Sequence, residues 1–399
     1  MKRRRDLGGL THPGDGARFP GHFDPACGVN IPLLDLVAQH QTIRDEVLAA
    51  LARVVDRQQF ILGEEVDRLE SAVAQLCRAA HGIGCASGTD ALLLPLRTLG
   101  LSPADEVITP AFTFFATAGT IHNAGGTPVF VDIDPVSFNL DPAAVEAAIT
   151  PRTRAIVAVH LFGQMAAMES LLAIAGRHGL VLIEDAAQAI GARRRVDGVW
   201  RMAGELGLVG ALSFFPTKNL GGWGDGGMIV TQDATLAERL YRLRTHGGLK
   251  QYYHDEVGYN SRLDTVQAAV LLAKLPHLAE WSAARRRLAV RYSAAFAGHP
   301  DLVPPAVDPE NEPIFHQYTL QASRRDALVA HLKARGIGSA VYYPLGLHLQ
   351  PCFRHLGYRP GSLPVTERVT DRVVSLPIYP ELTVEQQDRV IATVLDFYQ

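Results

Sequence analysis

The stretch Leu180-Val181-Leu182-Ile183-Glu184-Asp185-Ala186-Ala187-Gln188 places four consecutive apolar residues directly before two carboxylates. Such a run is typical of a strand buried on both faces of a parallel sheet, and ligands bind at the carboxyl ends of such strands. Adjacent residues on a strand point to opposite faces. We therefore expect one of Glu184 and Asp185 to face a ligand site and the other to face away from it.

Six further short apolar runs alternate with helical segments around this stretch, which is the pattern of βα units. The seven predicted strands cover residues 82–86, 106–109, 128–132, 155–160, 181–184, 211–214 and 228–231. Helices of ten or so residues fit between them, and no internal repeat is visible. The predicted fold class is therefore α/β, with a large, doubly wound layer around a mostly parallel seven-stranded sheet.

Composition shifts along the chain predict three parts. Residues 1–29 are rich in Gly, Pro and charge, show no apolar period and predict a flexible tail. Residues 30–275 predict a large domain that opens with two amphipathic helices. A long helical segment interrupted near Pro276, followed by a Pro-rich acidic stretch, leads into a smaller α+β C-terminal domain over residues 276–399.

Composition and charge also exclude several classes of protein. The 399 residues are 47% hydrophobic and 20% charged, which excludes disorder over most of the chain. A net charge of -3 gives no excess of positive charge to neutralise a nucleic acid. The scattered cysteines predict neither disulfides nor a metal site. With no signal peptide and no membrane-spanning run, we expect a cytoplasmic protein with no nucleic-acid or membrane partner.

The string Ser87-Gly88-Thr89-Asp90 follows one predicted strand and opens a helix. Glycine lets the backbone approach a ligand closely, and the free amides at a helix start attract an anion such as phosphate. Thr89 adds a hydroxyl donor. A serine or threonine that only caps the helix would give the same string, so this motif alone leaves both interpretations open.

A lysine follows another predicted strand in the string SFFPTKNLGGWGDGG, which covers residues 213–227. An amine held there, partly desolvated, suits Schiff-base chemistry. Gly222, Gly224 and Gly227 spell GxGxxG, but a strand follows them where a dinucleotide fingerprint requires a helix. A phosphate cradle, the acid Asp185 and the lysine Lys218 together fit pyridoxal phosphate, because they would hold its phosphate, ring nitrogen and aldehyde.

The chain resembles the DegT/DnrJ/EryC1/StrS family of sugar aminotransferases, which are pyridoxal-phosphate enzymes of the aspartate-aminotransferase-like fold type I. The resemblance runs from about residue 31 to the end. The strings that carry it are FILG at 60–63, SGTDAL at 87–92, EDAAQ at 184–188, SFFPTK at 213–218, GYNSRLD at 258–264 and LHLQP at 347–351.

The resemblance implies a role for each matching residue at the cofactor. Lys218 would form the imine with the cofactor aldehyde, Asp185 would pair with the pyridine nitrogen and Gln188 with the ring hydroxyl. Phe114 would lie on the ring face. The residues implied to hold the phosphate are Gly88, Thr89 and Ser213.

Further matching positions concern the neighbouring subunit and the substrate. Asn260 would reach the phosphate of the neighbouring subunit's cofactor, which implies a homodimer with shared active sites. His160, His254 and His348 match substrate-side positions, and for each of them a buried structural role is the alternative.

The implied activity is amino transfer from an amino acid, L-glutamate, to the ketone of a deoxysugar linked to a nucleoside diphosphate. The string at 260–264, with His254 before it, is more similar to the branch that acts at C3 than to the branch that acts at C4. Both an antibiotic sugar and a surface polysaccharide are open as the product's destination. A sugar dehydratase of the same fold would carry histidine where this chain has Lys218, and a cofactor-bound protein without activity is a further alternative.

Overall fold

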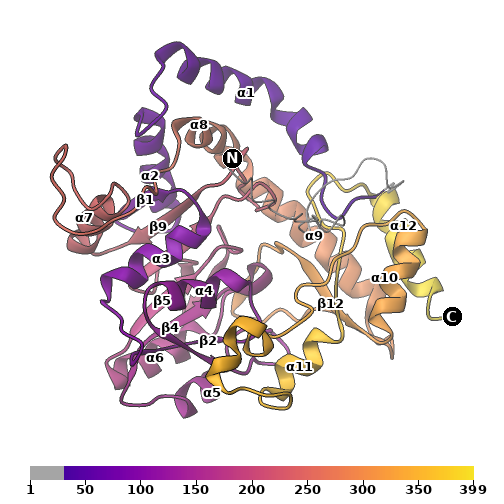
Figure 1. Cartoon of the computed structure of the whole chain (residues 1–399). Helices are drawn as coiled ribbons and strands as arrows, with labels where there is room; N and C mark the ends of the chain where they lie inside the picture. The colour runs from indigo at the N-terminus through magenta and orange to yellow at the C-terminus, as the bar shows by residue number, and fades with distance from the viewer. Residues whose placement is uncertain (1–30) are drawn as a thin grey trace, which may run out of the picture.

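The computed structural model describes residues 31–399, and the predicted tail, residues 1–29, lies outside these described residues. A large layered body holds a central sheet between helices, and a smaller body that carries the C-terminus lies beside it (Figure 1). The site predicted from the sequence belongs to the large body and lies at the strand ends of the large body's sheet.

Seven strands form the sheet of the large body: β1 His81–Cys85, β2 Glu106–Pro110, β3 Thr127–Val131, β4 Thr153–Val159, β5 Val181–Asp185, β8 Val209–Ser213 and β9 Gly227–Thr231. Their order is β1-β9-β8-β5-β4-β2-β3. The neighbours β8, β5, β4, β2 and β3 run parallel, whereas β9 is antiparallel to both β1 and β8. The predicted mostly parallel seven-stranded sheet is confirmed.

Helices cover both faces of this sheet because its strands are apolar on both sides. The helices on one face are α2 Glu64–Leu76, α5 Pro142–Ala147, α6 Met168–His178 and α8 Thr265–Lys274, and those on the other are α3 Gly88–Thr98, α4 Phe115–Asn123 and α7 Ala234–Leu243. Along β4, Ile156 packs with the first group and its neighbours Ala155 and Val157 with the second. Helix α1, Leu36–Arg57, packs against α8.

The chain leaves the large body through a break in a long helical segment. Helix α8 is followed by the 3₁₀ turn η3, Leu275–His277, and by α9, Leu278–Phe296. Pro276 lies in this turn, where a residue without an N–H interrupts the helical ladder. The interruption predicted near Pro276 is thus present.

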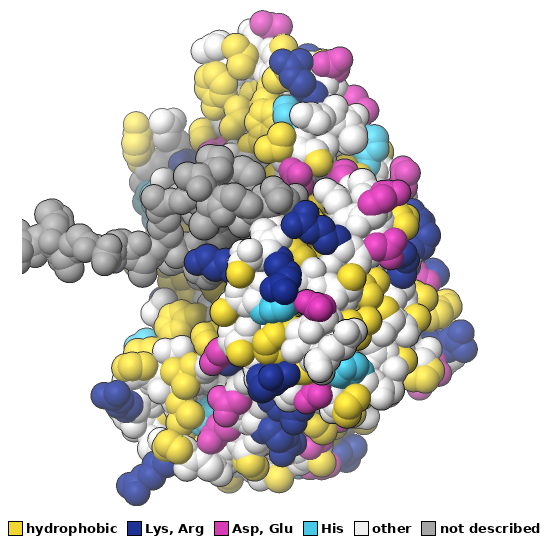
Figure 2. Space-filling model, turned by 90° about the vertical axis from the view of Figure 1, so that its right-hand side faces the viewer, with side chains coloured by type: hydrophobic (Ala, Val, Ile, Leu, Met, Phe, Trp, Pro, Cys, Tyr) yellow, Lys and Arg dark blue, Asp and Glu magenta, His cyan; other side chains and the backbone are white. Residues whose placement is uncertain are grey.

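The smaller body packs two helices on a three-stranded antiparallel sheet. Its elements are β10 Leu302–Val303, β12 Tyr318–Ala322, β13 Val373–Leu376, α10 Arg325–Ala334 and α12 Val384–Asp396. Tyr292 and Phe296 of α9 are fully buried in its core beside Tyr318. On the outer face shown in Figure 2, positive and negative side chains are interspersed.

Part of the C-terminal region returns to the large body through η4 Leu347–Leu349, η5 Pro351–Leu356 and α11 Pro364–Thr370. The hydroxyl of Tyr358 lies 3.0 Å from both the N and the O atom of Phe130 on the edge strand β3. Asp132, just beyond β3, accepts hydrogen bonds from the amides of Val365 and Thr366 at the start of α11. This segment therefore lies beside the C-terminal ends of the sheet strands.

A third, small sheet was not predicted. It consists of β6 Arg193–Val196, β7 Val199–Met202 and β11 Asn311–Glu312, and β11 falls in the stretch expected to be a linker. Asp197 and Gly198 both have positive φ in the tight hairpin turn between β6 and β7. The Asp-Gly pair is a hairpin signal, but the flanking strands are short and rich in arginine, so their apolar pattern does not predict a sheet.

Over residues 31–399, no helix combines the length and the apolar character needed to cross a membrane. Within the same range, no three His, Cys, Asp or Glu side chains lie close enough together to hold a metal ion.

Candidate active site

The C-terminal ends of β5 and β8 bring the predicted acid and lysine together. Asp185 is the last residue of β5 and is in register with Ala211 on β8. Strand β8 ends at Ser213, and the loop that follows it carries Lys218. Because neighbouring parallel strands end at the same edge, Asp185 and Lys218 lie close enough for their charges to interact.

The two carboxylates at the end of β5 have separate surroundings, as the strand alternation predicts. Glu184 is fully buried and accepts hydrogen bonds from Nε2 of His160 at 2.8 Å and from three backbone amides of the 204–207 loop. Burial acts to raise the pKa of Glu184, but these hydrogen-bond donors hold that pKa below its usual range. Glu184 is therefore a structural anion, and Asp185 is the carboxylate at the site.

Asp185 is 5% exposed. Burial raises its pKa, although hydrogen bonds from the Thr117 hydroxyl at 2.8 Å and the Ala187 amide at 3.2 Å, together with the charge of Lys218, act in the opposite direction. A further positive charge beside this carboxylate would favour its ionised form. A protonated pyridine nitrogen is such a charge.

Lys218 is half-buried in the loop after β8. Burial lowers the pKa of Lys218 to about 8, while the charge of Asp185 acts to raise it. A fraction of this amine is therefore neutral near pH 7 and can act as a nucleophile. The loop is tightly folded: a Cβ at Gly221 would lie 2.3 Å from the carbonyl oxygen of Pro216, so only glycine fits there.

The residue after Lys218 connects this loop to the segment that precedes β12. The Nδ2 of Asn219 donates to the carbonyl of Ile314 at 3.2 Å, so its Oδ1 is the acceptor for Nδ1 of His316 at 3.1 Å. Burial lowers the pKa of His316 well below its usual range, and the charges of Lys218 and Arg285 add to this effect. His316 is thus a neutral ring that carries its proton on Nδ1, and sequence reasoning did not select it.

The predicted phosphate site joins the start of α3 to the end of β8. A Cβ at Gly88 would lie 2.5 Å from the Cβ of Ser213, so this close approach requires glycine. Ser87 caps α3 by accepting a hydrogen bond from the amide of Asp90 at 3.1 Å. Capping and anion binding are compatible here, because the first amides of a helix have no acceptor within it. Thr89 is exposed at this helix start.

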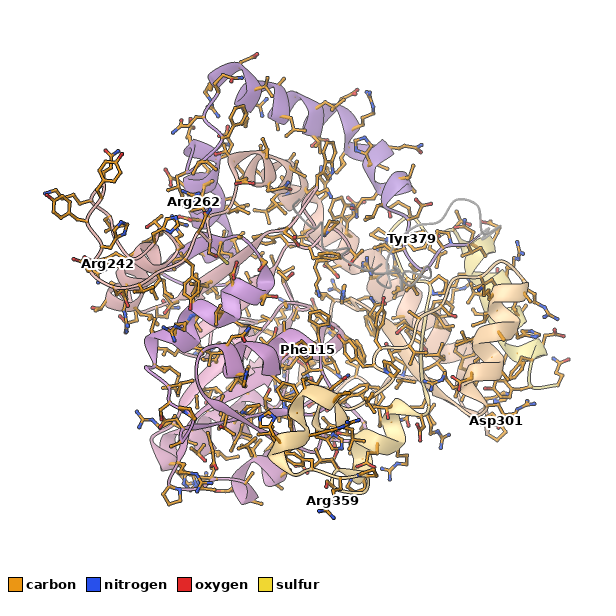
Figure 3. The ribbon with its side chains drawn as sticks, in the orientation of Figure 1. Phe115, Arg242, Arg262, Asp301, Arg359 and Tyr379 are labelled. Carbon is orange, nitrogen blue, oxygen red and sulfur yellow. The ribbon has the colours of Figure 1, made fainter. Side chains whose placement is uncertain are left out.

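Gln188 and Phe114 meet a tyrosine that sequence reasoning missed. Oε1 of Gln188 accepts from the amide of Phe162 at 2.8 Å, and its Nε2 donates to the Tyr343 hydroxyl at 3.0 Å. Phe114 is 57% exposed, and its ring centroid lies 6.4 Å from that of Tyr343. Phe115, the first residue of α4, instead stacks on a phenylalanine of η5 (Figure 3). Phe114 is thus the aromatic left available to cover a planar ligand ring.

The three predicted substrate-side histidines differ in their surroundings. His160 is fully buried between Glu184 and the amide of Ala166, so it has the structural role that the sequence left open. His348 is 1% exposed, and its Nε2 lies 3.1 Å from Oε1 of Glu367. His254 is exposed. A substrate contact of His254 or His348 stays a prediction.

Asn260 lies exposed at the end of the 246–262 segment, which projects beside α7 (Figure 1). The exposed apolar side chains of this segment are Leu249, Tyr252, Tyr253 and Val257. Tyr252 is 85% and Val257 87% exposed, which is unusual for residues of this size. The placement is compatible with a segment that is covered by a neighbouring subunit.

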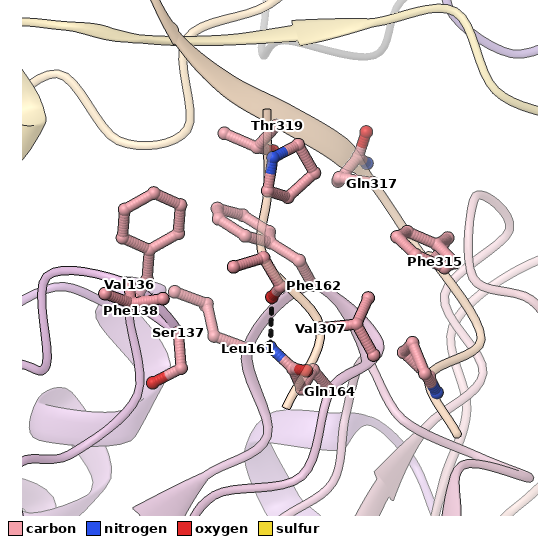
Figure 4. Close-up of a pocket in the computed structure, with 13 residues that line it drawn as sticks. Val136, Ser137, Phe138, Leu161, Phe162, Gln164, Val307, Phe315, Gln317 and Thr319 are labelled. Atoms are coloured by element: carbon pink, nitrogen blue, oxygen red, sulfur yellow. Dashed lines mark hydrogen bonds between the residues drawn. The ribbon is translucent and has the colours of Figure 1, made fainter. Parts of the chain in front are cut away.

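A cavity of about 30 Å³ lies between the two bodies, lined by residues from the 136–138, 161–164, 305–307 and 313–319 segments (Figure 4). That volume suits a water molecule and is too small for a cofactor or a sugar. Gln164 in its wall donates to the carbonyl of Ala306 at 3.2 Å and accepts from the amide of Asp308 at 3.0 Å. The cavity is therefore a packing feature of the domain contact.

The residues at the strand ends fit pyridoxal phosphate. The cradle at Gly88 excludes any side chain, Lys218 is a desolvated amine, and Asp185 is a buried acid with a lone pair left for a ring nitrogen. The family model of the DegT/DnrJ/EryC1/StrS aminotransferase family matches residues 41–395.

The chain belongs to this family.

Aminotransferases of the DegT/DnrJ/EryC1/StrS family depend on pyridoxal phosphate, and the chain is a fold type I enzyme of this kind. A Geobacillus stearothermophilus relative named "Pleiotropic regulatory protein" is 52% identical over 93% of this chain and 99% of its own length. UDP-N-acetyl-3-dehydro-alpha-D-glucosamine 3-aminotransferase of Acidithiobacillus ferrooxidans is 49% identical over 92% and 97%. The crystal structure of S. venezuelae DesV with a ketimine intermediate has a TM-score of 0.89 and 45% identity, covering 92% of this chain and 98% of that one.

Proposed function

We propose that this aminotransferase moves the amino group of an amino acid, L-glutamate, to the C3 ketone of a deoxysugar linked to a nucleoside diphosphate. The observation that carries the proposal is the placement of Asp185 at the end of β5 and of Lys218 in the loop after the neighbouring strand β8, beside the Gly88–Ser213 cradle. The A. ferrooxidans relative, named for a 3-aminotransferase reaction on a UDP-linked sugar, supports the substrate class.

Each residue of the site has a separate task in this reaction. Bound pyridoxal phosphate supplies an electron sink and carries the amino group between donor and acceptor. Asp185 would hold a proton at the ring nitrogen, and Gln188 would orient the ring by a contact with the hydroxyl group of the ring. Lys218 would hold the cofactor through its aldehyde carbon, and its amine would be the group that accepts and returns a proton during amino transfer. The lowered pKa of Lys218 suits both steps, because the amine can gain and lose a proton near neutral pH.

The cradle between α3 and β8 would anchor the phosphate of the cofactor. The amides at the start of α3, the Thr89 hydroxyl and the Ser213 hydroxyl bind the phosphate oxygens. Phe114 covers the exposed ring face and keeps water from it.

The C3 preference rests on the 260–264 string and His254 and on the name of the A. ferrooxidans relative. It is tested by loading the enzyme with pyridoxamine phosphate and adding 3-keto or 4-keto nucleotide sugars separately. Return of the absorbance of the lysine-bound cofactor with the 3-keto sugar supports the proposal. Turnover of the 4-keto sugar alone would refute the C3 preference and leave amino transfer intact.

Two alternatives are separated by simpler measurements. A sugar dehydratase is disfavoured because position 218 is lysine. The second alternative is a protein that binds the cofactor without catalysing a reaction, and it is suggested by the name of the G. stearothermophilus relative, which describes a regulator. Bleaching of the yellow cofactor by L-glutamate, and its loss on borohydride treatment only when Lys218 is present, would support an enzyme; a colour that no amino acid changes would support the alternative.

The active unit in this proposal is a homodimer with shared active sites. Exposed apolar side chains gather on α1 and the turn after it, and yellow side chains crowd the upper part of Figure 2. The exposed apolar side chains of α1 and of this turn are Leu36, Val37, Leu48, Val55, Phe60, Ile61 and Leu62. A surface of this kind is typical of a subunit interface, and Asn260 would enter the partner's site from the 246–262 segment.

A further inference from the structure

Two buried threonine hydroxyls lead to the carboxylate of Asp185. Thr117, in the first turn of α4, places its Oγ1 2.8 Å from Oδ2 of Asp185, and the Oγ1 of Thr113 lies 3.1 Å from that of Thr117. Thr113 is 2% and Thr117 1% exposed. Enclosed hydroxyls need hydrogen-bond partners, and these three side chains supply them for one another.

The chemistry of the three groups fixes the direction of the hydrogen bonds. An ionised carboxylate can only accept, so the O–H of Thr117 donates to Asp185. The oxygen of Thr117 is then free to accept from the O–H of Thr113. Successive hydrogen bonds of one direction strengthen each other, so the chain is polarised toward Asp185. The Ala187 amide donates to the other carboxylate oxygen at 3.2 Å and fixes the rotation of the group.

Asp185 needs these donors because its burial acts against the ionised form. Burial raises its pKa, and the hydrogen bond from Thr117 is the largest opposing influence, followed by the Ala187 amide and the charge of Lys218. A protonated Asp185 has no charge with which to hold a proton on a ring nitrogen. The Thr117 hydroxyl therefore works in favour of the form that the cofactor needs.

We infer that Thr117, polarised by Thr113, is a positioning residue that keeps Asp185 ionised and turned toward the ring nitrogen of bound pyridoxal phosphate. The inference rests on the proposed role of Asp185. Neither hydroxyl touches the reacting atoms, so both act through the carboxylate. Loss of these two hydroxyl groups would weaken the interaction between Asp185 and the proton on the ring nitrogen. The cofactor would then bind less tightly and would be a weaker electron sink.

The chain offers a matched set of variants. Thr117→Val replaces the hydroxyl by a methyl group of the same shape, and Thr117→Ser restores the donor. Thr113→Val removes the distant donor and leaves the contact with Asp185. Thr120→Val is the control, because Thr120 lies in the same helix, is 1% exposed and donates to the carbonyl of Thr117 without touching Asp185.

Two readouts besides activity apply: the Kd of the apo-enzyme for pyridoxal phosphate, and the pH midpoint at which the visible absorbance of the lysine-bound cofactor changes. A positive ring nitrogen repels a proton on the nitrogen that joins the cofactor to Lys218. Thr117→Val should therefore raise this midpoint by about half a unit or more and weaken cofactor binding about 10-fold. Thr113→Val should show a smaller change in the same direction, and Thr117→Ser and Thr120→Val should match the wild type.

The outcomes separate this inference from the function on which it rests. If Asp185→Asn shifts both readouts and Thr117→Val shifts neither, the hydroxyl chain is only structural and the inference fails. If Asp185→Asn also leaves both unchanged, the assignment of Asp185 to the ring nitrogen fails as well. Equal changes in the Val variants of Thr117 and Thr120 would overturn the inference in favour of a packing effect. Should Thr117→Val not fold, Thr113→Val gives the decision, because wild-type values of both readouts in that variant would overturn the inference.

Discussion

The Nζ atom of Lys274 donates a 2.7 Å hydrogen bond to the carbonyl oxygen of Gly221, which joins the last turn of α8 to the loop that carries Lys218. Lys274 is 4% exposed, and burial lowers its pKa to about 8 while the charge of Glu381 acts to raise it. A charged donor is among the stronger hydrogen-bond partners of a carbonyl. The lysine loop is therefore attached to a core helix.

Lys274→Met tests this attachment, because it keeps the apolar stem and removes the donor. The carbonyl of Gly221 would lose its partner at a cost of about 1–3 kcal/mol. We expect a melting temperature lower by a few degrees and a several-fold weaker affinity for pyridoxal phosphate. Lys333→Met, at an exposed position on α10, is the control and should change neither. Unchanged cofactor affinity in Lys274→Met would show that the loop holds its shape without this bond.

The pKa of Lys218 sets the pH dependence of cofactor capture. Only the neutral amine attacks the aldehyde, and its pKa of about 8 lies below the ordinary value of about 10.4. The rate constant for pyridoxal phosphate binding to apo-enzyme should rise with pH, with a midpoint near 8. Between pH 8 and about 10.4 the unfolded chain binds more protons at this position, so its contribution to stability improves as pH rises through that window. A kinetic midpoint near 10 would contradict the desolvated setting.

Gly88→Ala probes the phosphate cradle. The new Cβ would lie 2.5 Å from the Cβ and 2.8 Å from the Oγ of Ser213, so one side of the cradle must move. Cofactor affinity should fall about 10-fold or more, as loss of well-placed phosphate contacts implies. Gly176→Ala is the matched control, because a Cβ there meets nothing within 4 Å and alanine favours the helix α6. Equal effects of the two changes would exclude a specific role for Gly88.

Glu184→Gln tests the structural role of the second carboxylate. The buried anion loses its charge while it faces His160 and three backbone amides, so we expect a loss of about 2–4 kcal/mol in the free energy of unfolding. The folded-state pKa of Glu184 lies below its unfolded value, so this stabilisation is present above about pH 4.3 and is lost as the pH falls further. The deficit measured by urea unfolding should therefore shrink in acid. Glu280→Gln, exposed on α9, should show no deficit.

A mixing experiment tests whether Asn260 acts in the partner's active site. Lys218→Ala and Asn260→Ala are each expected to be nearly inactive alone. In a mixed dimer, one site would combine an intact Lys218 with an intact Asn260 from the other subunit. Random reassociation of equal amounts of the two variants should therefore make about a quarter of all active sites complete and restore about a quarter of the wild-type activity. Absence of any recovery, with mixed dimers shown by mass spectrometry, would place Asn260 within its own subunit's site or outside both.

The residues that the sequence reveals are those whose position in a strand or loop determines their neighbours. Four apolar residues before two carboxylates predict a buried strand with an acid at its ligand-binding end, and Asp185 lies there. The glycine-rich loop after β8 likewise identifies Lys218. These signals are local, because the chemistry follows directly after a buried strand.

Residues that approach the site from distant parts of the chain gave no such signal. Thr117 reaches Asp185 across 68 positions, and Tyr343 reaches Gln188 across 155. Their contacts depend on how α4 and the returning C-terminal segment pack, which spacing does not encode. His160 shows the converse, since its position in a motif suggested substrate while burial against Glu184 assigns it to the core.

The hydroxyl of Tyr358 accepts a hydrogen bond from the amide of Phe130 and donates one to its carbonyl, on the edge strand β3. An uncovered border strand can recruit a strand from another molecule, which starts aggregation. The C-terminal region therefore covers part of the exposed edge of the sheet and also lies near the active site. Variants that loosen this region, or proteolysis near it, should yield precipitating protein before they yield merely inactive protein.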